Sequence, residues 1–245
     1  MGSGTAVPSL QRNSSGFLLQ NAKVNTLIDF GYGNLKQLLS LGITYHDIDR
    51  IFFTHNHPDH MCDLIPFLFA SRYQPDSRKK ELEIITGPGF QDFFDKLMLA
   101  FKHWLKPTEY KLKIIEIDEG TKEFEEMNVK IGKVKHIAMS RGFRFTNSKG
   151  KSVSFSGDTD YCQGMVELGR NADLMILECA WPDEEKTDGH LGPTLAGKLA
   201  AEANCKKLCL THFYPPCDLK NIRKTIQKNY KGELVLARDL MQFYL

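Results

Sequence analysis

Residues 54–60 read Thr-His-Asn-His-Pro-Asp-His and directly follow the apolar run Ile-Phe-Phe at positions 51–53. In extended backbone, side chains two residues apart point to the same side, so His55 and His57 can bind one ion together. Pro58 favours the start of a helix, which lets Asp59 and His60 turn toward a second ion. Imidazole and carboxylate suit zinc and neighbouring first-row metals. A polar loop seldom concentrates four such groups by chance, so this stretch predicts a metal centre.

Four protein ligands cannot complete two metal sites, so further ligands are expected elsewhere in the chain. His136 follows VKIGKVK, Asp158 follows VSFSG and His212 follows LCLT. Taken singly, each has an ordinary explanation, as a hydrogen-bonded histidine or an aspartate in a turn. Their repeated placement at the ends of apolar strands predicts a cluster at one edge of a sheet. Of the eight histidines, only His46 and His103 are left without a site role.

Composition gives a weak indication of partners. The 245 residues carry a net charge of +2, well below the basic bias of most nucleic-acid-binding domains, so charge neither excludes nor suggests RNA. The apolar stretches, such as Leu64–Ala70, are too short to cross a bilayer, and the N-terminus lacks a basic region followed by an apolar run. We therefore expect no signal peptide, no membrane partner and a cytoplasmic protein. The six cysteines form no CxxC motif, which predicts reduced, buried thiols.

Short apolar strands alternate with amphipathic helices along the whole chain, without a linker or a repeat. This pattern predicts a single α/β domain of layered sheets over residues 1–245. The predicted strands are Thr26–Phe30, Arg50–Thr54, Leu82–Ile85, Val129–Val134, Ser152–Ser156, Leu174–Glu178, Lys207–Thr211 and Glu233–Ala237, with a hairpin turn at Asn147–Lys151 before the strand SVSF. The predicted helices are Asn34–Leu41, Asp59–Tyr73, Phe90–Leu105, Thr194–Ala203 and Leu219–Lys228.

With the motif His-x-His-x-Asp-His and the later ligands in this order, the chain resembles the metallo-β-lactamase superfamily. The resemblance implies a four-layer αββα sandwich with a dinuclear metal site at the mouth between two sheets. It also implies that Asp29, in Leu-Ile-Asp-Phe-Gly, orients a metal-bound histidine, although an aspartate at a strand end is ordinary. By the same resemblance, one ion is held by His55, His57 and His136, the other by Asp59, His60 and His212, and Asp158 bridges them.

Three further features resemble the ribonuclease Z-like branch of this superfamily. The first is the opening turn at residues 2–8 with Arg-Asn-Ser-Ser at 12–15, and the second is Thr-Gly-Pro-Gly at 86–89, which is otherwise a plain turn. The third is Glu178 with His190, a pair that in this branch serves the leaving group. The ordinary alternative for His190 is a solvent-exposed loop histidine.

Two departures argue against processing of tRNA. Ribonuclease Z carries a long arm between the third histidine and the bridging aspartate, but here His136 and Asp158 are only 22 positions apart. Moreover, His212 is followed by Phe-Tyr-Pro-Pro-Cys and not by the Ser-x-Arg-Tyr of tRNA processors. We therefore expect a compact form without the tRNA arm, acting on a small phosphodiester or nucleotide, with RNA a secondary candidate. The resemblance also implies a homodimer.

The expected chemistry is that of a dinuclear hydrolase. Two divalent ions, zinc or alternatively Mn²⁺ or Fe²⁺, about 3.5–4 Å apart can hold a bridging hydroxide as nucleophile. Asp59 can orient that nucleophile or accept its proton. His190, polarised by Glu178, would protonate the departing alkoxide. A β-lactam or thioester needs such an acid less, so His190 favours a phosphodiester.

Three other functions are alternatives to this one. The same metal site can hydrolyse a carbonyl substrate, such as a thioester or lactone. A binding protein on a decayed hydrolase fold is disfavoured because all seven expected ligands are present. A redox di-iron protein typically has glutamate where this chain has His57. Two readings also remain for a basic and aromatic hairpin, which either contacts phosphate and stacks a base or is solvated with its rings in the core. Its residues are Arg141, Phe143, Arg144, Phe145, Lys149 and Lys151.

Overall fold

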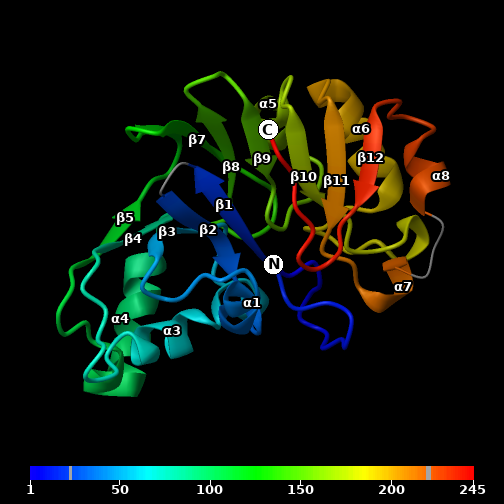
Figure 1. Ribbon diagram of the computed structural model, residues 1–245. Helices are drawn as coiled ribbons and strands as arrows, with labels where there is room; N and C mark the ends of the chain where they lie inside the picture. The colour runs from blue at the N-terminus through cyan, green and yellow to red at the C-terminus, as the bar shows by residue number, and fades with distance from the viewer. Residues whose placement is uncertain (22–23, 219–221) are drawn as a thin grey trace.

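A computed structural model describes residues 1–21, 24–218 and 222–245, which form two sheets (Figure 1). The first sheet has the order β1 (Gly16–Asn21), β2 (Val24–Phe30), β3 (Ile48–Phe53), β4 (Leu82–Thr86) and β5 (Leu112–Glu116). The second runs from β6 (Gly120–Glu123) through β7 (Met127–Lys133), β8 (Arg141–Asn147), β9 (Ser152–Phe155), β10 (Leu174–Glu178) and β11 (Lys207–Thr211) to β12 (Glu233–Leu236). Strands β2 to β5 are parallel to one another, as are β9 to β12.

Helices cover the outer face of each sheet. On the first sheet lie α1 (Asn34–Ser40), α3 (Leu64–Ala70) and α4 (Phe90–Phe101), and on the second α5 (Gln163–Gly169), α6 (Pro193–Ala203) and α8 (Ile222–Ile226). The remaining helical turns are short: α2 (Pro58–Met61), η1 (Lys102–Leu105), η2 (Asp183–Glu185) and α7 (Pro215–Asp218).

The strands pack on both faces because alternate side chains point to opposite sides. In β3, Ile51 and Phe53 pack beneath the helices, whereas Phe52 faces the other sheet and joins the core between the two. In β10, Met175 contacts the helices of its own sheet and Ile176 faces inward. The two sheets therefore pack face to face, and helices cover the outer face of each. The predicted αββα fold is confirmed.

The structure corrects the predicted helix at Asp59–Tyr73, which is divided into α2 and α3. The amide of Asp63 donates to the carbonyl of Phe30 at 3.0 Å, and this contact with β2 interrupts the helical hydrogen-bonding pattern. The predicted helix at Phe90–Leu105 likewise ends as α4 at Phe101 and continues as the 3₁₀ turn η1. The predicted helix at Leu219–Lys228 begins outside the described residues, and α8 covers its middle part. Strands β1, β5 and β6 are absent from the predicted set, and β8 is implied there only by the hairpin turn at Asn147–Lys151.

The basic hairpin is structural. Its aromatic side chains, Phe143 and Phe145, are buried in the core between the sheets. Arg141 is buried and donates to the carboxylate and carbonyl of Asp118, and Arg144 donates to the carbonyl of Leu168. The turn with Lys149 and Lys151 lies at the opposite end of β8 and β9 from Asp158, about 20 Å away for strands of this length. Phe143 and Phe145 therefore cannot stack a base, and the alternative with the rings in the core is confirmed.

Asp173 contacts the starts of β9 and β11, the strands that lead to Asp158 and His212. Its carboxylate accepts hydrogen bonds from the backbone of Ser152, at the start of β9, at 2.9 Å and from the ammonium of Lys206 at 2.8 Å. Burial alone would favour the neutral acid, but these donors outweigh it and lower the pKa of Asp173 to about 2.

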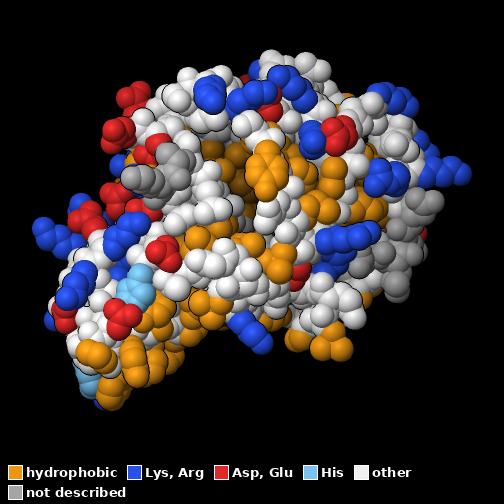
Figure 2. Space-filling view, in the orientation of Figure 1, with side chains coloured by type: hydrophobic (Ala, Val, Ile, Leu, Met, Phe, Trp, Pro, Cys, Tyr) orange, Lys and Arg blue, Asp and Glu red, His pale blue; other side chains and the backbone are white. Residues whose placement is uncertain are grey.

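A cavity of about 280 Å³ opens between the sheets on the face shown in Figure 2, where hydrophobic side chains line a recess. Phe17 and Leu19 of β1, Val153 of β9 and the C-terminal residues 240–245 line it. None of the predicted metal ligands lies in its wall, so the apolar cavity and the predicted site are separate places in the fold.

All six cysteines are free thiols, as predicted; four are buried, whereas Cys62 and Cys162 are only partly so. Within the described ranges, no helix has the length and apolarity needed to cross a membrane.

Candidate metal centre

The ends of several strands deliver the predicted ligands to one place. The loop after β3 carries His55 and His57, and α2 carries Asp59 and His60. From the second sheet, His136 follows β7, Asp158 follows β9 and His212 follows β11. The predicted start of a helix at Pro58 is present, because Pro58 is the first residue of α2.

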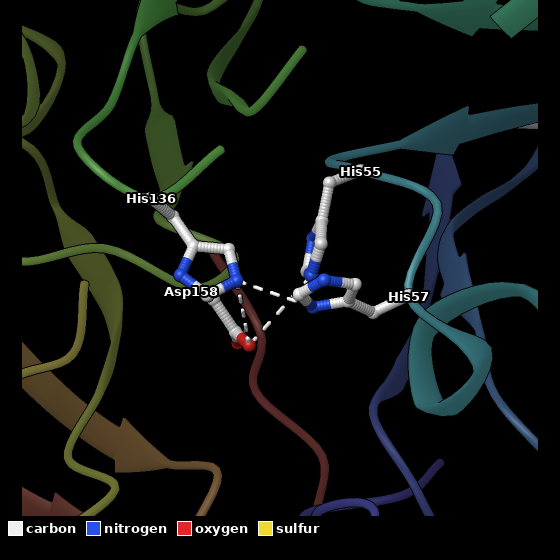
Figure 3. A group of neighbouring side chains, drawn as sticks. All are labelled: His55, His57, His136 and Asp158. Atoms are coloured by element: carbon white, nitrogen blue, oxygen red, sulfur yellow. Dashed lines mark hydrogen bonds and ion pairs between the residues drawn. The ribbon is translucent and has the colours of Figure 1, made fainter. Parts of the chain in front are cut away.

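One group of ligand atoms comes from His55, His57, His136 and Asp158, and all of these atoms lie within 4.8 Å of one another. Figure 3 shows the three rings and the carboxylate pointing toward a common centre. His57 Nδ1 lies 3.2 Å from His136 Nε2, and His55 Nε2 lies 3.7 Å from Asp158 Oδ2. These are three nitrogens and one oxygen, a donor set that suits zinc.

The second group joins Asp59, His60 and His212, also within 4.8 Å. His60 Nε2 is 3.2 Å from His212 Nε2, which in turn is 3.3 Å from Asp59 Oδ2. Asp158 faces this group as well, because its Oδ1 lies 3.1 Å from His60 Nε2 and 3.3 Å from His212 Nε2. Its two oxygens therefore face different groups.

Asp29 orients His60 directly and His55 through Thr54. Its backbone is left-handed, with φ 55°, and its Oδ2 accepts a hydrogen bond from His60 Nδ1 at 2.7 Å. This bond leaves His60 Nε2 directed at the centre. Asp29 Oδ1 also accepts the backbone N–H of Thr54 at 2.8 Å, and the hydroxyl of Thr54 lies 3.0 Å from His55 Nδ1. Sequence reasoning missed this role of Thr54, although its position beside the first histidine was a usable signal.

The carbonyl of Gly189 orients His136. His136 Nδ1 donates to it at 3.0 Å, which directs Nε2 toward His57. A Cβ at Gly189 would lie 2.8 Å from His136 Nδ1, and the backbone φ there is +81°, so the position requires glycine. Sequence reasoning did not find this contact, because a backbone carbonyl 53 residues away gives no signal in the sequence.

Glu178, at the end of β10, accepts four hydrogen bonds. Oε1 accepts from the backbone of Thr159 at 2.8 Å and from His190 Nδ1 at 2.9 Å. Oε2 accepts from the backbone of Leu191 at 3.1 Å and of Ala180 at 3.2 Å. The buried carboxylate thus links the Asp158 loop to the loop that carries His190, and it fixes the His190 ring through Nδ1.

The electrostatics of the site favour neutral imidazoles at His55 and His136 and an ionised carboxylate at Asp158. Burial lowers the pKa of His55 well below its ordinary value and that of His136 to about 4. Burial of Asp158 favours the neutral acid, but the neighbouring His212 and His60 outweigh it and hold the pKa of Asp158 well below its ordinary value. Neutral imidazole and ionised carboxylate are the forms that bind metal.

The pKa values of His60 and His190 are raised, because each ring is hydrogen-bonded through Nδ1 to a carboxylate. Burial disfavours the imidazolium, but Asp158 and Asp29 outweigh it and raise the pKa of His60 well above its ordinary value. Burial also opposes the charge on His190, yet its bond to Glu178 raises the pKa of His190. The pKa of Glu178 is raised by burial, which His190 opposes.

The residues present fit bound metal ions. His55 Nε2 is fully buried and has no hydrogen-bond partner, which is a costly state unless a cation accepts its lone pair. The two separations of 3.2 Å between imidazole nitrogens match the roughly 3.3 Å between ligands that surround zinc tetrahedrally at about 2.0–2.1 Å. His190 lies near Asp158 and His212 as well, but its Nδ1 is already bound to Glu178.

The two-sheet fold and these His/Asp clusters define a metal-dependent hydrolase of the metallo-β-lactamase fold. The sequence model of the beta-lactamase superfamily domain matches residues 24–213, and the chain belongs to this family, in its ribonuclease Z-like branch.

Three known proteins illustrate the relationship. The chain is 30% identical to ribonuclease Z of Brevibacillus brevis over 88% of this chain and 84% of that protein. It is 28% identical to human tRNase Z, short form, whose crystal structure superposes with a TM-score of 0.76 over 98% of this chain and 95% of that one. The metallo-beta-lactamase fold protein YhfI from Bacillus subtilis superposes with a TM-score of 0.83 at 24% identity, covering 97% and 94% of the two chains, a likeness of fold alone.

Proposed function

We propose that residues 1–245 act as a single dinuclear phosphodiesterase domain that takes small phosphodiesters or nucleotides. The observation that carries this proposal is the placement of Asp158, which turns one oxygen toward each group of ligands. One carboxylate between two clusters of imidazoles is the arrangement needed for two neighbouring ions.

In this proposal, His55, His57 and His136 would hold one ion, Asp59, His60 and His212 would hold the other, and Asp158 would contribute an oxygen to each. When bound, two divalent ions, expected to be zinc with Mn²⁺ or Fe²⁺ as alternatives, would supply a hydroxide nucleophile at neutral pH and would offset the negative charge of a phosphodiester. Asp59 is buried and lies 3.3 Å from His212 Nε2, so its carboxylate can orient the nucleophile or accept its proton.

His190 supplies the proton for the leaving group. Its Nδ1 is bound to Glu178, which leaves Nε2 as the atom that can donate to a departing alkoxide. Its ring lies 4.8 Å from that of His136 and 6.0 Å from that of His212, between centroids, so it borders both groups. An alkoxide is a poor leaving group without a proton, and this geometry favours a phosphodiester over a thioester or lactone.

The space above the site favours a small substrate. Between His136 and Asp158 the chain forms only a short loop and the β8–β9 hairpin, whose basic turn lies at the far end of the strands. No arm leaves the site within this interval to hold a large RNA, although the names ribonuclease Z and tRNase Z of the relatives keep RNA as a candidate substrate. We also propose that the protein is a homodimer, as the resemblance implies. Light scattering tests this by measuring the molar mass in solution.

Elemental analysis and a substrate panel test this function. Protein purified without chelator and reconstituted with zinc should bind close to two ions per chain, and at most one tightly bound ion would refute the dinuclear site. The panel compares bis-p-nitrophenyl phosphate, cyclic nucleotides, a precursor tRNA, a thioester and a β-lactam. We expect turnover of the small phosphodiesters and poor processing of precursor tRNA. Selective cleavage of precursor tRNA at its 3′ end, or turnover of the thioester alone, would contradict the proposal.

A further inference from the structure

Strands β10 and β11 place two aromatic rings side by side at the rim of the candidate site. Glu178 and Thr211 are partners in the parallel register of these strands, and Trp181 and Tyr214 each lie three residues beyond them. The two rings are stacked, with centroids 4.5 Å apart and planes 12° apart. The amide of Tyr214 also donates to the carbonyl of Ala180 at 3.2 Å, so the two segments are held in this register.

The ring pair borders the side of the site where His190 lies. The Tyr214 centroid is 5.8 Å from that of His212 and 6.5 Å from that of His190, with the ring planes nearly perpendicular. His190 is the proposed acid, so the pair stands next to the place from which the leaving group departs.

Core packing does not account for these rings. Trp181 and Tyr214 are only half-buried, and neither belongs to the three hydrophobic clusters formed by the described residues. A stacked pair keeps one outer face on each ring. A planar group can extend the stack from such a face, whereas a saturated group gains little there.

We propose that Trp181 and Tyr214 form a stacking platform for a nucleobase and make the site selective for nucleotide diesters over phosphodiesters that lack a base. This inference rests on the phosphodiesterase function proposed above and names the part of the substrate that is recognised. Stacking of one base on an aromatic side chain corresponds to about a 5- to 150-fold gain in binding. Because every base has a π-face, the platform selects bases as a class and not one sequence.

The kinetic test is a specificity ratio. For each variant, kcat/KM is measured on thymidylyl-3′,5′-thymidine and on its analogue in which the base of the leaving nucleoside is replaced by hydrogen. Tyr214→Leu and Trp181→Leu should each lower the ratio of the two values by about 5- to 150-fold, chiefly through KM. The matched variants Tyr214→Phe and Trp181→Phe keep a ring and should keep most of the ratio. An unchanged ratio in both leucine variants, with equal losses on the two substrates, would show that the rings only support the loops and would overturn the proposal.

A binding measurement keeps this inference separate from the proposed function. The chain has two tryptophans, so Trp104→Phe leaves Trp181 as the reporter of fluorescence. Adenosine 5′-monophosphate should quench this signal at a concentration at least about fivefold lower than ribose 5-phosphate needs. Equal concentrations for the two ligands would refute the platform whether or not any diester is hydrolysed. Conversely, selective quenching by the nucleotide without turnover of any diester would uphold the platform and reject the phosphodiesterase.

Discussion

Glu178→Gln changes one atom in a carboxylate whose four hydrogen-bond donors are all identified. Three of the donors are backbone amides, from Thr159, Ala180 and Leu191, and the fourth is His190 Nδ1. A glutamine offers one acceptor oxygen, and its amide nitrogen must face two of these donors.

The loss of stability in Glu178→Gln depends on the orientation of the glutamine amide, and the orientation that leaves fewer donors unpaired is expected. If the amide nitrogen faces His190, the imidazole can change tautomer and accept from it, so only the N–H of Thr159 loses its partner. An unsatisfied buried donor costs about 1–3 kcal/mol. For a chain of this size, that corresponds to a fall in Tm of about 2–12 °C. The opposite orientation would leave two amides unpaired and would cost about twice as much, so the first is expected.

The substitution also removes the carboxylate charge that supports an imidazolium at His190. The rate on a diester with an alkoxide leaving group should therefore fall, whereas a nitrophenyl ester, whose leaving group needs no proton, should be affected less. Thermal unfolding at fixed zinc concentration and kcat on both substrates are the measurements. Glu185→Gln is the control, because this nearby carboxylate is exposed and its loss should change stability by no more than about 0.5 kcal/mol. A Glu178→Gln protein with the Tm of the parent, or with equal rate losses on the two esters, would refute the reasoning.

Three further outcomes are expected. His212→Ala should lose metal and activity together. His190→Ala should keep both ions, but its rate should fall by about 10²–10⁴-fold on a diester with an alkoxide leaving group and by much less on a nitrophenyl ester. Loss of an ion from His190→Ala would place His190 among the metal ligands. Asp29→Asn should weaken zinc binding by about 10- to 100-fold in a chelator competition, because His60 loses its orienting carboxylate, and unchanged affinity would contradict that role. The pKa of Asp173 is lowered to about 2 from an ordinary 3.8, so its ionised form contributes about 2 kcal/mol to the free energy of unfolding above pH 5, and this contribution should decline by about 1 kcal/mol by pH 3. Urea unfolding of Asp173→Asn and of the parent at pH 7 and pH 3 measures the difference in stability. A difference that does not change with pH would argue against this role.

The clustering of the candidate ligands was predictable from the sequence because these residues come in a short motif and at strand ends. His55 to His60 are local in sequence, and His136, Asp158 and His212 each end an apolar run that marks a strand. The alternation of apolar strands with amphipathic helices also predicted an α/β domain of layered sheets, and the resemblance implied the four-layer αββα arrangement.

Contacts made through the backbone were not predictable. The carbonyl of Gly189 has no side-chain signature, and the split between α2 and α3 depends on the carbonyl of Phe30 in a distant strand. The basic hairpin shows the same limit, since its sequence left two readings open, and the side-chain bond from Arg141 to Asp118 is visible only in the structure. The stack of Trp181 on Tyr214 likewise requires the register of β10 against β11, which no local pattern specifies.

Each proposed ion takes ligands from both sheets, and this has a topological consequence. His57 and His136 are 79 residues apart in the chain, and His60 and His212 are 152 apart. With an ion bound to each pair, the chain is closed into two large loops that overlap along the sequence. The cost of closing such loops rises only slowly with their length, so two ions can join the halves of a long chain about as readily as those of a short one. The ions would then act as reversible crosslinks between the two sheets. The free energy needed to separate the sheets at the site would therefore depend on the concentration of free metal.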